Sequence, residues 1–523
     1  MTRHIGAELL KAWLSGSTEI ALIDVREHGQ YGEGHPLFSV SVPYSTFEMG
    51  ISTLVPNPRV RLVLCDAGDG VAERAAGAAE AMGYANVCVL AGGVDAWREA
   101  GYTLYAGVNV PSKAFGELVE HTRGTPRVAA QDLKAMQDAG ENMVIVDGRT
   151  FAEFQRMSIP GGISCPNGEL ALRIGSLVPD PATRIIVNCA GRTRSIIGAQ
   201  TLIDLGVPNP VYALENGTQG WFLAGLQLDH GASRRYGPAP PMASLETLRS
   251  SVRALAEGRG VAFVAAEEAA RWLADSTRTT YLLDVRTPEE FAEQPVQGFV
   301  HAPGGQLVQA ADQWIGVRGA RIVLLDAEQV RAPMTAQWLR QQGHEAYVLE
   351  GGIAGAGALA GRPTAAVDLP EPASVAPEEL SPALGSGAVR LIDLRPSMSY
   401  RKGHISGAVW SIRPRIASAI GHPAEPVVLI ADRPGVAALA ALDLAAAGVR
   451  DVRQLAGGHE AAQAAGLPME TVPELPVDAD CIDFLFFTAA RHDGDAAAAH
   501  QYLAWELGLV DQLDAQERGV FRL

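Results

Sequence analysis

Short apolar runs recur along the chain in a fixed order, and each closes on polar residues. Four of them end in Asp-x-Arg, at Asp24, Asp147, Asp284 and Asp393. Each is followed by a second apolar run with its loop, an alanine-rich stretch of helical length, and a short third run that leads to a glycine signal. Buried strands produce such runs, and their alternation with helical stretches predicts a mainly parallel sheet with helices on both faces. We therefore expect an α/β chain.

The four copies keep nearly constant internal spacing. The residues that we expect at the start of each loop are Cys65, Cys189, Leu325 and Ala431. They lie 41, 42, 41 and 38 residues after the four aspartates, and 28, 28, 27 and 27 residues before the last glycine of each signal. Such regular repetition predicts four tandem domains of about 100 to 110 residues, a usual size for one hydrophobic core.

Clusters of proline and glycine mark the boundaries between these copies, because both residues interrupt regular structure. We expect a first domain at 1–107, a second at 125–236, a third at 258–363, a fourth at 374–472, and an α-rich C-terminal tail at 473–523. In the tail, the apolar run 482–487 could add a strand, and 496–513 predicts an amphipathic helix. That helix is ordinarily interpreted as a docking or oligomer element, although Arg491, His492 and Asp493 could reach an active site in another domain.

The second domain carries a chemically distinctive loop, residues 189–195, which we call the cysteine loop. Its apolar run ends on Cys189, and a small-residue helix follows. The intervening residues are Ala190, Gly191, Arg192, Thr193, Arg194 and Ser195. Loop N–H groups and the positive end of a helix dipole stabilise an anion on sulfur, and two guanidinium groups add positive charge. We therefore expect a lowered thiol pKa and a thiolate populated near neutral pH.

Cys189 and Arg194 form a C-x4-R loop, which resembles the active-site loop of rhodanese sulfurtransferases. The four Asp-x-Arg runs and the glycine signals resemble rhodanese domains, and Trp97 and Trp221 follow the first two signals. The resemblance implies that Cys189 carries a transferable sulfur as a persulfide. Phosphatase-like relatives use C-x5-R, and Ser195 stands at that position here, which disfavours a phosphatase or arsenate reductase.

The resemblance also implies roles for the surrounding residues. The cysteine thiolate would take the outer sulfur of thiosulfate, or of a mercaptopyruvate-type donor, and pass it to cyanide or a thiol in a two-step covalent mechanism. Residues 190–195 would bind the donor, with Arg192 and Arg194 orienting its oxyanion. Thr193 and Ser195 would donate hydrogen bonds or cap the helix. Asp147 and Arg149 would brace the loop, or form a structural ion pair that every domain shares.

The other three loops differ from the cysteine loop. Leu325 and Ala431 cannot carry sulfur, so we expect the third and fourth domains to be inactive. Cys65 is kept as a second candidate site, but its loop contains Asp66 and Asp69 and no arginine. Nearby carboxylates raise a thiol pKa and repel an anionic donor, so Cys189 is the main prediction.

Composition and charge indicate which classes of partner to expect for this chain. A net charge of −17 argues against nucleic acid, and no apolar stretch reaches the ~20 residues of a membrane span. The first residues show no signal peptide, and an odd count of five cysteines favours a reducing, cytoplasmic location. No spacing indicates a metal site or a cofactor motif. Oligomer formation stays open.

Two hypotheses for function follow from these observations. The first is a thiosulfate sulfurtransferase with one competent domain, for which the cysteine loop is the main support. The second is a persulfide carrier or docking scaffold that delivers sulfur to an acceptor protein, which would give the silent domains a use. Stoichiometric sulfur loading without turnover would distinguish the carrier from the enzyme.

Overall fold

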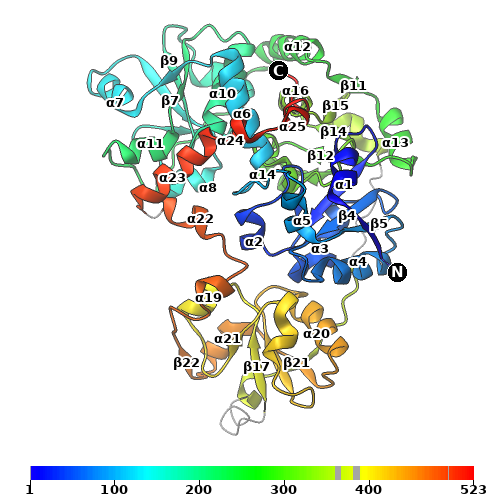
Figure 1. The fold of residues 1–523 in the computed structure, drawn as a ribbon. Coiled ribbons are helices and arrows are strands. Elements are labelled where there is room, and N and C mark those ends of the chain that lie inside the picture. The colour runs from blue at the N-terminus through cyan, green and yellow to red at the C-terminus, as the bar shows by residue number, and fades with distance from the viewer. Residues whose placement is uncertain (1, 360–366, 381–388, 493) are drawn as a thin grey trace.

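A computed structural model describes residues 2–359, 367–380, 389–492 and 494–523. Its first three domains lie together, and the fourth lies below them in Figure 1. The fourth domain also contacts the first directly, where Arg413 pairs with Glu48 at 2.6 Å. The expected end of the third domain at residue 363 and the tail residue Asp493 lie outside the described residues.

The first two domains run through the same order of elements. The first contains β1 (Arg3–Ile5), α1 (Ala7–Leu14), β2 (Ile20–Asp24), α2 (His28–Glu33), β3 (Val40–Ser41), α3 (Phe47–Leu54), β4 (Arg61–Cys65), α4 (Val71–Ala81), β5 (Val87–Leu90) and α5 (Gly93–Glu99). After a connecting helix, α6 (Val110–Arg123), the second contains β6 (Arg127–Val128), α7 (Ala130–Asp138), β7 (Met143–Asp147), α8 (Phe151–Arg156), β8 (Ile163–Ser164), α9 (Asn167–Leu177), β9 (Arg184–Asn188), α10 (Thr193–Asp204), β10 (Val211–Leu214) and α11 (Gly217–Leu223).

The last two domains repeat the pattern. After α12 (Met242–Gly258), the third contains β11 (Ala262–Val264), α13 (Ala266–Ala274), β12 (Thr280–Asp284), α14 (Pro288–Glu293), β13 (Val300–His301), α15 (Gly304–Gln309), β14 (Arg321–Leu325), α16 (Arg331–Gln341), β15 (Glu345–Leu349) and α17 (Gly352–Gly355). The fourth contains β16 (Ala373–Val375), β17 (Arg390–Asp393), α19 (Ser397–Lys402), β18 (His404–Ile405), β19 (Val409–Trp410), β20 (Val427–Ile430), α20 (Val436–Ala446), β21 (Val452–Leu455), α21 (Gly458–Ala464) and β22 (Met469–Glu470).

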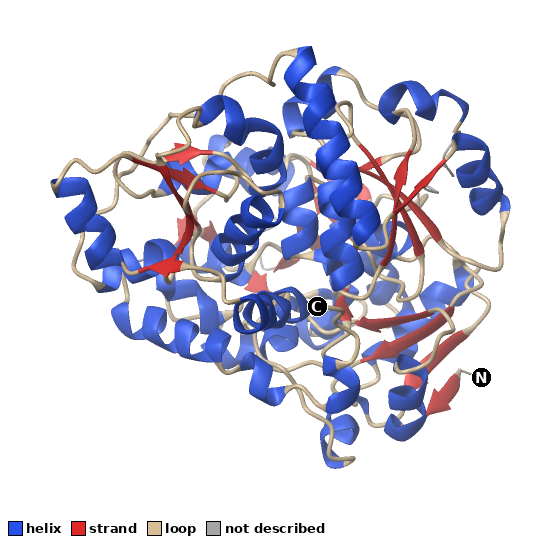
Figure 2. Ribbon diagram, turned by 90° about the horizontal axis from the view of Figure 1, so that it is seen from above, coloured by secondary structure: helices blue, strands red, loops and turns tan. Residues whose placement is uncertain are grey.

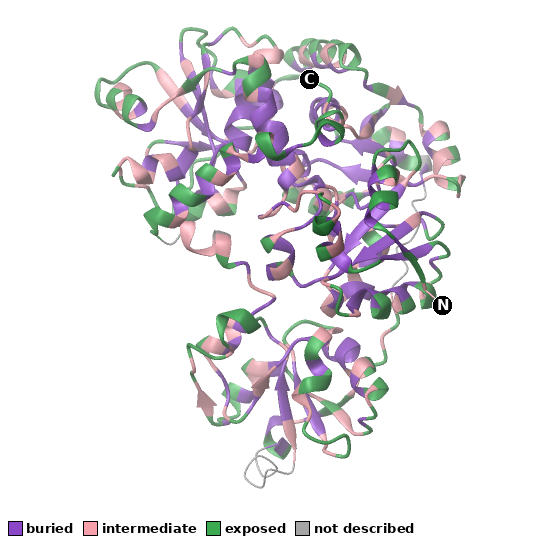
Figure 3. Ribbon diagram, in the orientation of Figure 1, coloured by how far each residue is buried: buried purple, intermediate pink, exposed green. Residues whose placement is uncertain are grey.

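All four domains share one sheet topology. The strand order is β1-β5-β4-β2-β3 in the first domain, β6-β10-β9-β7-β8 in the second, and the corresponding order in the others. Neighbouring strands of these sheets pair in parallel, as β7 does with β9, and helices lie on either side of the sheets (Figure 2). In the fourth domain, β18 and β22 form a separate antiparallel pair. Buried residues gather in the strands and on the helix faces turned toward them (Figure 3). The predicted fold class is confirmed, because apolar runs covered on both faces favour parallel strands.

The connection between the first two domains is a helix rather than an open linker. Pro111 stands in the first turn of α6, where its missing N–H costs no hydrogen bond, and Gly124 ends the helix with a φ of 60°. Most of α6 is buried, and Phe115 and Val119 pack against Ile196 of α10. This helix therefore brings side chains from outside the second domain to the start of α10.

The tail returns from the fourth domain across the other three, through α22 (Phe486–Ala489), α23 (Ala496–Leu507), α24 (Leu509–Gln512) and α25 (Ala515–Arg518). The expected strand at 482–487 is wrong, because this segment meets α2 instead of a sheet edge, and the Gln30 N–H donates to the Ile482 carbonyl at 3.2 Å. The expected helix is present as α23 and α24. Further on, Lys11 of the first domain pairs with Asp514 and Glu517, and the Arg522 N–H donates to the Gln341 carbonyl of the third.

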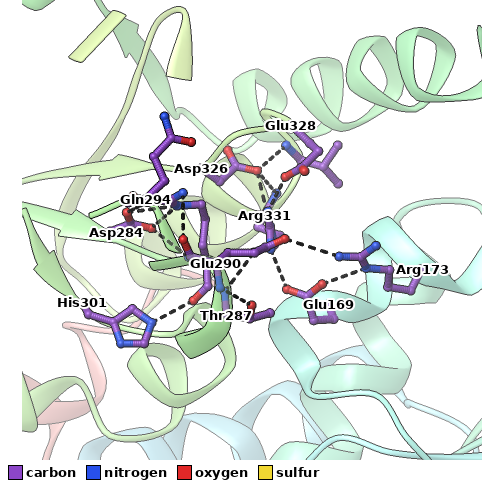
Figure 4. A network of polar contacts seen from close by, with 12 residues as sticks. Glu169, Arg173, Asp284, Thr287, Glu290, Gln294, His301, Asp326, Glu328 and Arg331 are labelled. Atoms are coloured by element: carbon purple, nitrogen blue, oxygen red, sulfur yellow. Dashed lines mark hydrogen bonds and ion pairs between the residues drawn. The ribbon is translucent and has the colours of Figure 1, made fainter. Parts of the chain in front are cut away.

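The second and third domains meet through a buried guanidinium (Figure 4). The Arg331 side chain has 0% relative exposure, and it donates to Glu169 of the second domain at 2.9 Å. It also pairs with Glu290 and Glu328 of its own domain, and Arg173 reaches the same Glu169 at 2.9 Å. A buried cation needs such partners, so this network joins α9 to α16. In the described part of the chain, no helix is long and apolar enough to cross a membrane.

Candidate active site

The cysteine loop lies at the carboxyl end of the second sheet. Cys189 directly follows β9, and α10 begins at Thr193. The Thr218 N–H donates to the Cys189 carbonyl at 2.9 Å, and the Gln219 N–H donates to the Ala190 carbonyl at 3.1 Å. Gly217 has a φ of +55°, and a Cβ atom there would clash with the Cys189 carbonyl oxygen. The glycine signal therefore permits the close approach that holds the loop in place.

The strand register corrects the positions assumed to be equivalent to Cys189. Asp147 pairs with Asn188, whereas Asp24 pairs with Cys65 and Asp284 pairs with Leu325. Cys65 and Leu325 are thus level with Asn188. The residues level with Cys189 are Asp66, Asp326 and Ala431, and each places its carbonyl oxygen against the glycine signal as Cys189 does. In the first and third domains, the residue expected from the spacing lies one position before the true equivalent of Cys189, because these loops also begin one residue after the strand ends.

The equivalent aspartates show what this loop geometry binds. Asp326 Oδ2 accepts the N–H groups of Val330 and Arg331, both at 3.0 Å. Asp66 accepts the N–H groups of Gly68 and Ala72 at 2.8 and 2.9 Å. In both domains a side-chain carboxyl group therefore receives N–H groups of the loop and of the helix start, and in the cysteine loop the Ser195 N–H acts on the Cys189 thiol. Converging N–H groups at a helix start form an anion site.

The expected low pKa of Cys189 is wrong for the structure as it stands. The residue is only 2% exposed, and burial raises the pKa of its thiol above the usual value. The Arg194 guanidinium lowers that pKa, as do the hydroxyl and N–H of Ser195, while the charge of Glu506 raises it. Desolvation of the thiolate outweighs the positive groups because the tail covers the loop.

The two arginines of the loop take different positions. Arg192 donates to Glu117 of α6 at 2.7 and 2.8 Å, and it also pairs with Glu120. Its charge is therefore committed to α6, which does not fit the expected role in orienting a donor. Arg194 pairs with Glu153 at 2.7 Å and remains close enough to Cys189 to affect its pKa. This guanidinium holds the pKa of Glu153 down, at about 2, although burial opposes it.

The two hydroxyl groups of the loop also differ. The Thr193 hydroxyl donates to Glu506 Oε1 at 2.8 Å. The Ser195 hydroxyl lies 2.8 Å from the Arg192 carbonyl, where it supports the first turn of α10. Gly191 is covered by the tail, since a Cβ atom there would lie 2.9 Å from Glu506 Oε2 and 3.3 Å from the Tyr502 ring. The loop and α23 thus form one packed unit.

The Asp147–Arg149 pair is a shared structural feature with one local addition. Arg149 donates to Asp147 at 2.8 and 2.9 Å, and the equivalent pair occurs in every domain. In the second domain, the Asn188 amide also donates to Asp147 Oδ2 at 2.6 Å. The pair therefore supports the backbone next to Cys189.

All five cysteines are free and buried. Cys65 packs with Leu90 and Trp97, and burial raises the pKa of its thiol well above the usual value. Cys165 packs with Leu170 and its thiol pKa is raised by burial as well. Among the described residues, no three His, Cys, Asp or Glu side chains form a group that could hold a metal ion.

Several residues near the loop escaped the sequence analysis. Lys113 and Glu117 lie between the expected bounds of the first and second domains, and Tyr502 and Glu506 lie on the tail. Glu153 carried a signal, because Thr150 and Glu153 form the Thr-x-x-Glu capping box of α8. Only the three-dimensional arrangement brings the other four to the loop.

Comparisons with known proteins agree with this architecture. The family model described as Rhodanese-like domain matches residues 6–100, 129–224, 265–358 and 376–465. A solved thiosulfate sulfurtransferase from Pseudomonas aeruginosa is 42% identical, and the match covers 99% of each chain with a TM-score of 0.90. The HTH-type transcriptional regulator Rv0324 of Mycobacterium tuberculosis is 33% identical over 116 residues, so the match spans 22% of this chain and 50% of that relative. The chain therefore belongs to the rhodanese-like sulfurtransferase family and contains four tandem copies of its domain.

Proposed function

We propose that this chain is a thiosulfate sulfurtransferase that works through a persulfide on Cys189. The observation that carries this proposal is the anion site of the loop. In the second domain a thiol takes the position that Asp66 and Asp326 occupy in the sister domains, and Arg194 and Ser195 favour its anionic form. The 42% identity to a thiosulfate sulfurtransferase along the whole chain supports the class of donor.

The chemistry has two steps. The Cys189 thiolate attacks the outer sulfur of thiosulfate, the S–S bond of the donor breaks, and its electron pair leaves with sulfite. Loop N–H groups stabilise the resulting persulfide. A nucleophile such as cyanide or a thiol then takes the outer sulfur and regenerates the thiolate. Ping-pong kinetics are expected from this sequence of steps.

A small acceptor fits the site better than a protein partner does. Cys189 is 2% exposed, and Gly191 and Thr193 lie against α23. A persulfide carrier that hands sulfur to an acceptor protein would have to move α23 away from the loop. The five free cysteines also support a reducing compartment, and we propose a cytoplasmic location on that basis.

The direct test is loading of the full chain. The protein is incubated with thiosulfate, digested without reductant, and analysed by mass spectrometry. We expect a gain of one sulfur atom on the peptide that contains Cys189 and none on the peptide with Cys65. Loading on Cys65 alone would contradict the proposal, and loading without turnover toward cyanide or thiols would favour the carrier.

A further inference from the structure

The tail places a carboxylate against the cysteine loop, and one of its oxygens accepts no hydrogen bond from the part of the chain that the structure describes. Glu506 is 1% exposed, and its Oε1 atom accepts the Thr193 hydroxyl at 2.8 Å. Its Oε2 atom has no hydrogen-bond partner among the described residues. That atom faces the loop, since a Cβ atom on Gly191 would lie 2.9 Å from it. A buried carboxylate oxygen without a donor is costly, so its retention here points to a ligand that supplies one.

A second unused polar group lies beside the first. Both amide atoms of the buried Gln219 lack a partner within the described part of the chain. The Gln219 Nε2 atom would lie 3.7 Å from a Cβ atom on Gly191. The amide and the carboxylate thus approach the same point of the loop from α11 and from α23.

A buried ammonium group approaches from α6. Lys113 lies one helical turn before Glu117, which holds Arg192. Its Nζ atom lies 4.6 Å from the Trp505 ring centre and 5.1 Å from that of Tyr502, and no described carboxylate pairs with it. Burial lowers the pKa of Lys113 to about 8, and the charge of Glu506 is the main opposing influence. The ammonium and the carboxylate therefore affect each other without forming an ion pair.

Thiosulfate and cyanide do not account for this arrangement. Thiosulfate is a dianion and cyanide reacts as its anion, and a carboxylate beside the loop repels both anions. Among the described residues, this carboxylate and this ammonium have no ion-pair partner, and together they complement a ligand that carries the opposite pair of charges. Resting on the proposed function, we infer that the sulfur acceptor is a small amino-acid thiol, whose ammonium binds Glu506 Oε2 and whose carboxylate approaches Lys113.

The transfer step balances without a further reactant. The acceptor thiol releases its proton to solvent, and its thiolate attacks the outer sulfur of the protonated Cys189 persulfide. A bond forms between the acceptor sulfur and the outer sulfur of the persulfide, and the S–S bond between Cys189 Sγ and that outer sulfur breaks. The electron pair stays on Cys189 Sγ as a thiolate, and the acceptor leaves as a persulfide.

Four thiols that differ in charge test the ammonium and the carboxylate of the acceptor separately. Cysteine carries both charges, cysteamine only the ammonium, 3-mercaptopropionate only the carboxylate, and 2-mercaptoethanol neither. The full chain is loaded with thiosulfate, freed of excess donor and mixed with each thiol. Loss of the Cys189 persulfide is followed by quenching and mass spectrometry, and rate constants are expressed per thiolate. We expect cysteine to react fastest.

Two variants then assign the charges. Relative to 2-mercaptoethanol, Glu506→Gln should slow cysteine and cysteamine about tenfold, the loss of one charge-assisted hydrogen bond, and should not slow 3-mercaptopropionate. Lys113→Met should slow cysteine and 3-mercaptopropionate in the same selective way. Glu517→Gln, on α25 and paired with Lys11, is the matched tail control and should leave all four rates unchanged.

The outcomes separate this inference from the proposed function. Equal rates for the four thiols, or an equal loss for all four in Glu506→Gln, would overturn the inference and leave the sulfurtransferase in place. If Cys189 does not load at all, the proposed function fails and the inference fails with it.

Discussion

The Thr193 hydroxyl donates to Glu506 Oε1 at 2.8 Å, so a helix near the end of the chain is bonded to the first turn after Cys189. These residues are 313 positions apart in the sequence. The contact makes the tail part of the site, and it places a negative charge where a thiolate must form. Its consequences can be measured at the sulfur.

Removing the charge of Glu506 should make Cys189 more acidic. Burial is the main cause of its raised pKa, and the Glu506 charge adds to it. In Glu506→Gln that contribution is lost, so the thiol pKa falls and the thiolate is populated at lower pH. The rate of Cys189 alkylation against pH should therefore shift to lower pH, whereas Glu517→Gln should match the unmodified protein. A shift to higher pH would contradict the assigned electrostatics.

Replacing Arg194 should have the opposite effect. Its guanidinium lowers the Cys189 pKa, so Arg194→Met should move the pH profile of sulfur loading to higher pH. Loading at neutral pH should slow on the order of 100-fold, the usual loss when a preorganised anion-stabilising group is removed. Single-turnover release of sulfite from thiosulfate measures this rate. Unchanged loading would show that Arg194 only supports Glu153.

Replacing Arg192 should lower the stability of the fold and leave the pH profile of sulfur loading unchanged. Its removal leaves Glu117 buried without its cation, and such a loss typically costs about 3–5 kcal/mol. Arg192→Met should therefore lower the melting temperature, and Arg192→Met combined with Glu117→Gln should recover part of it. Melting of the single variant at the temperature of the unmodified protein would contradict the buried pairing.

Cys65 should behave as a core residue. In the strand register Cys65 is level with Asn188 and not with Cys189, and it packs among apolar side chains. Cys65→Ala should therefore load sulfur and turn over like the unmodified protein. Cys65→Ser buries a hydroxyl instead and should destabilise the fold by about 1–3 kcal/mol. Denaturant unfolding of both variants checks the difference, and a loss of turnover in the stable Cys65→Ala protein would place chemistry in the first domain.

Most of the fold can be predicted from the sequence. The apolar runs, the Asp-x-Arg ends and the glycine signals are local patterns, and each repeats four times. The assignment of Cys65 and Leu325 as equivalents of Cys189 is wrong by one position, and the spacing from the aspartate indicates this. Cys189 lies 42 residues after its aspartate, whereas Cys65 and Leu325 lie 41 residues after theirs.

The surroundings of Cys189 are much less accessible from the sequence. Proximity of Lys113, Tyr502 and Glu506 depends on how α6 and α23 pack on another domain, and no local pattern encodes that. The prediction of a low Cys189 pKa is wrong for the same reason, because the charges of the loop are visible in the sequence and its burial under the tail is not. The commitment of Arg192 to Glu117 likewise involves a helix that the sequence presents as a linker.

Turnover is expected to depend on Cys189 alone. Sulfur transfer from thiosulfate to cyanide should be measured for the full chain beside Cys189→Ser and Cys65→Ala. We predict turnover in the unmodified protein and in Cys65→Ala, and none in Cys189→Ser. Turnover that survives in Cys189→Ser would show that another residue carries the sulfur.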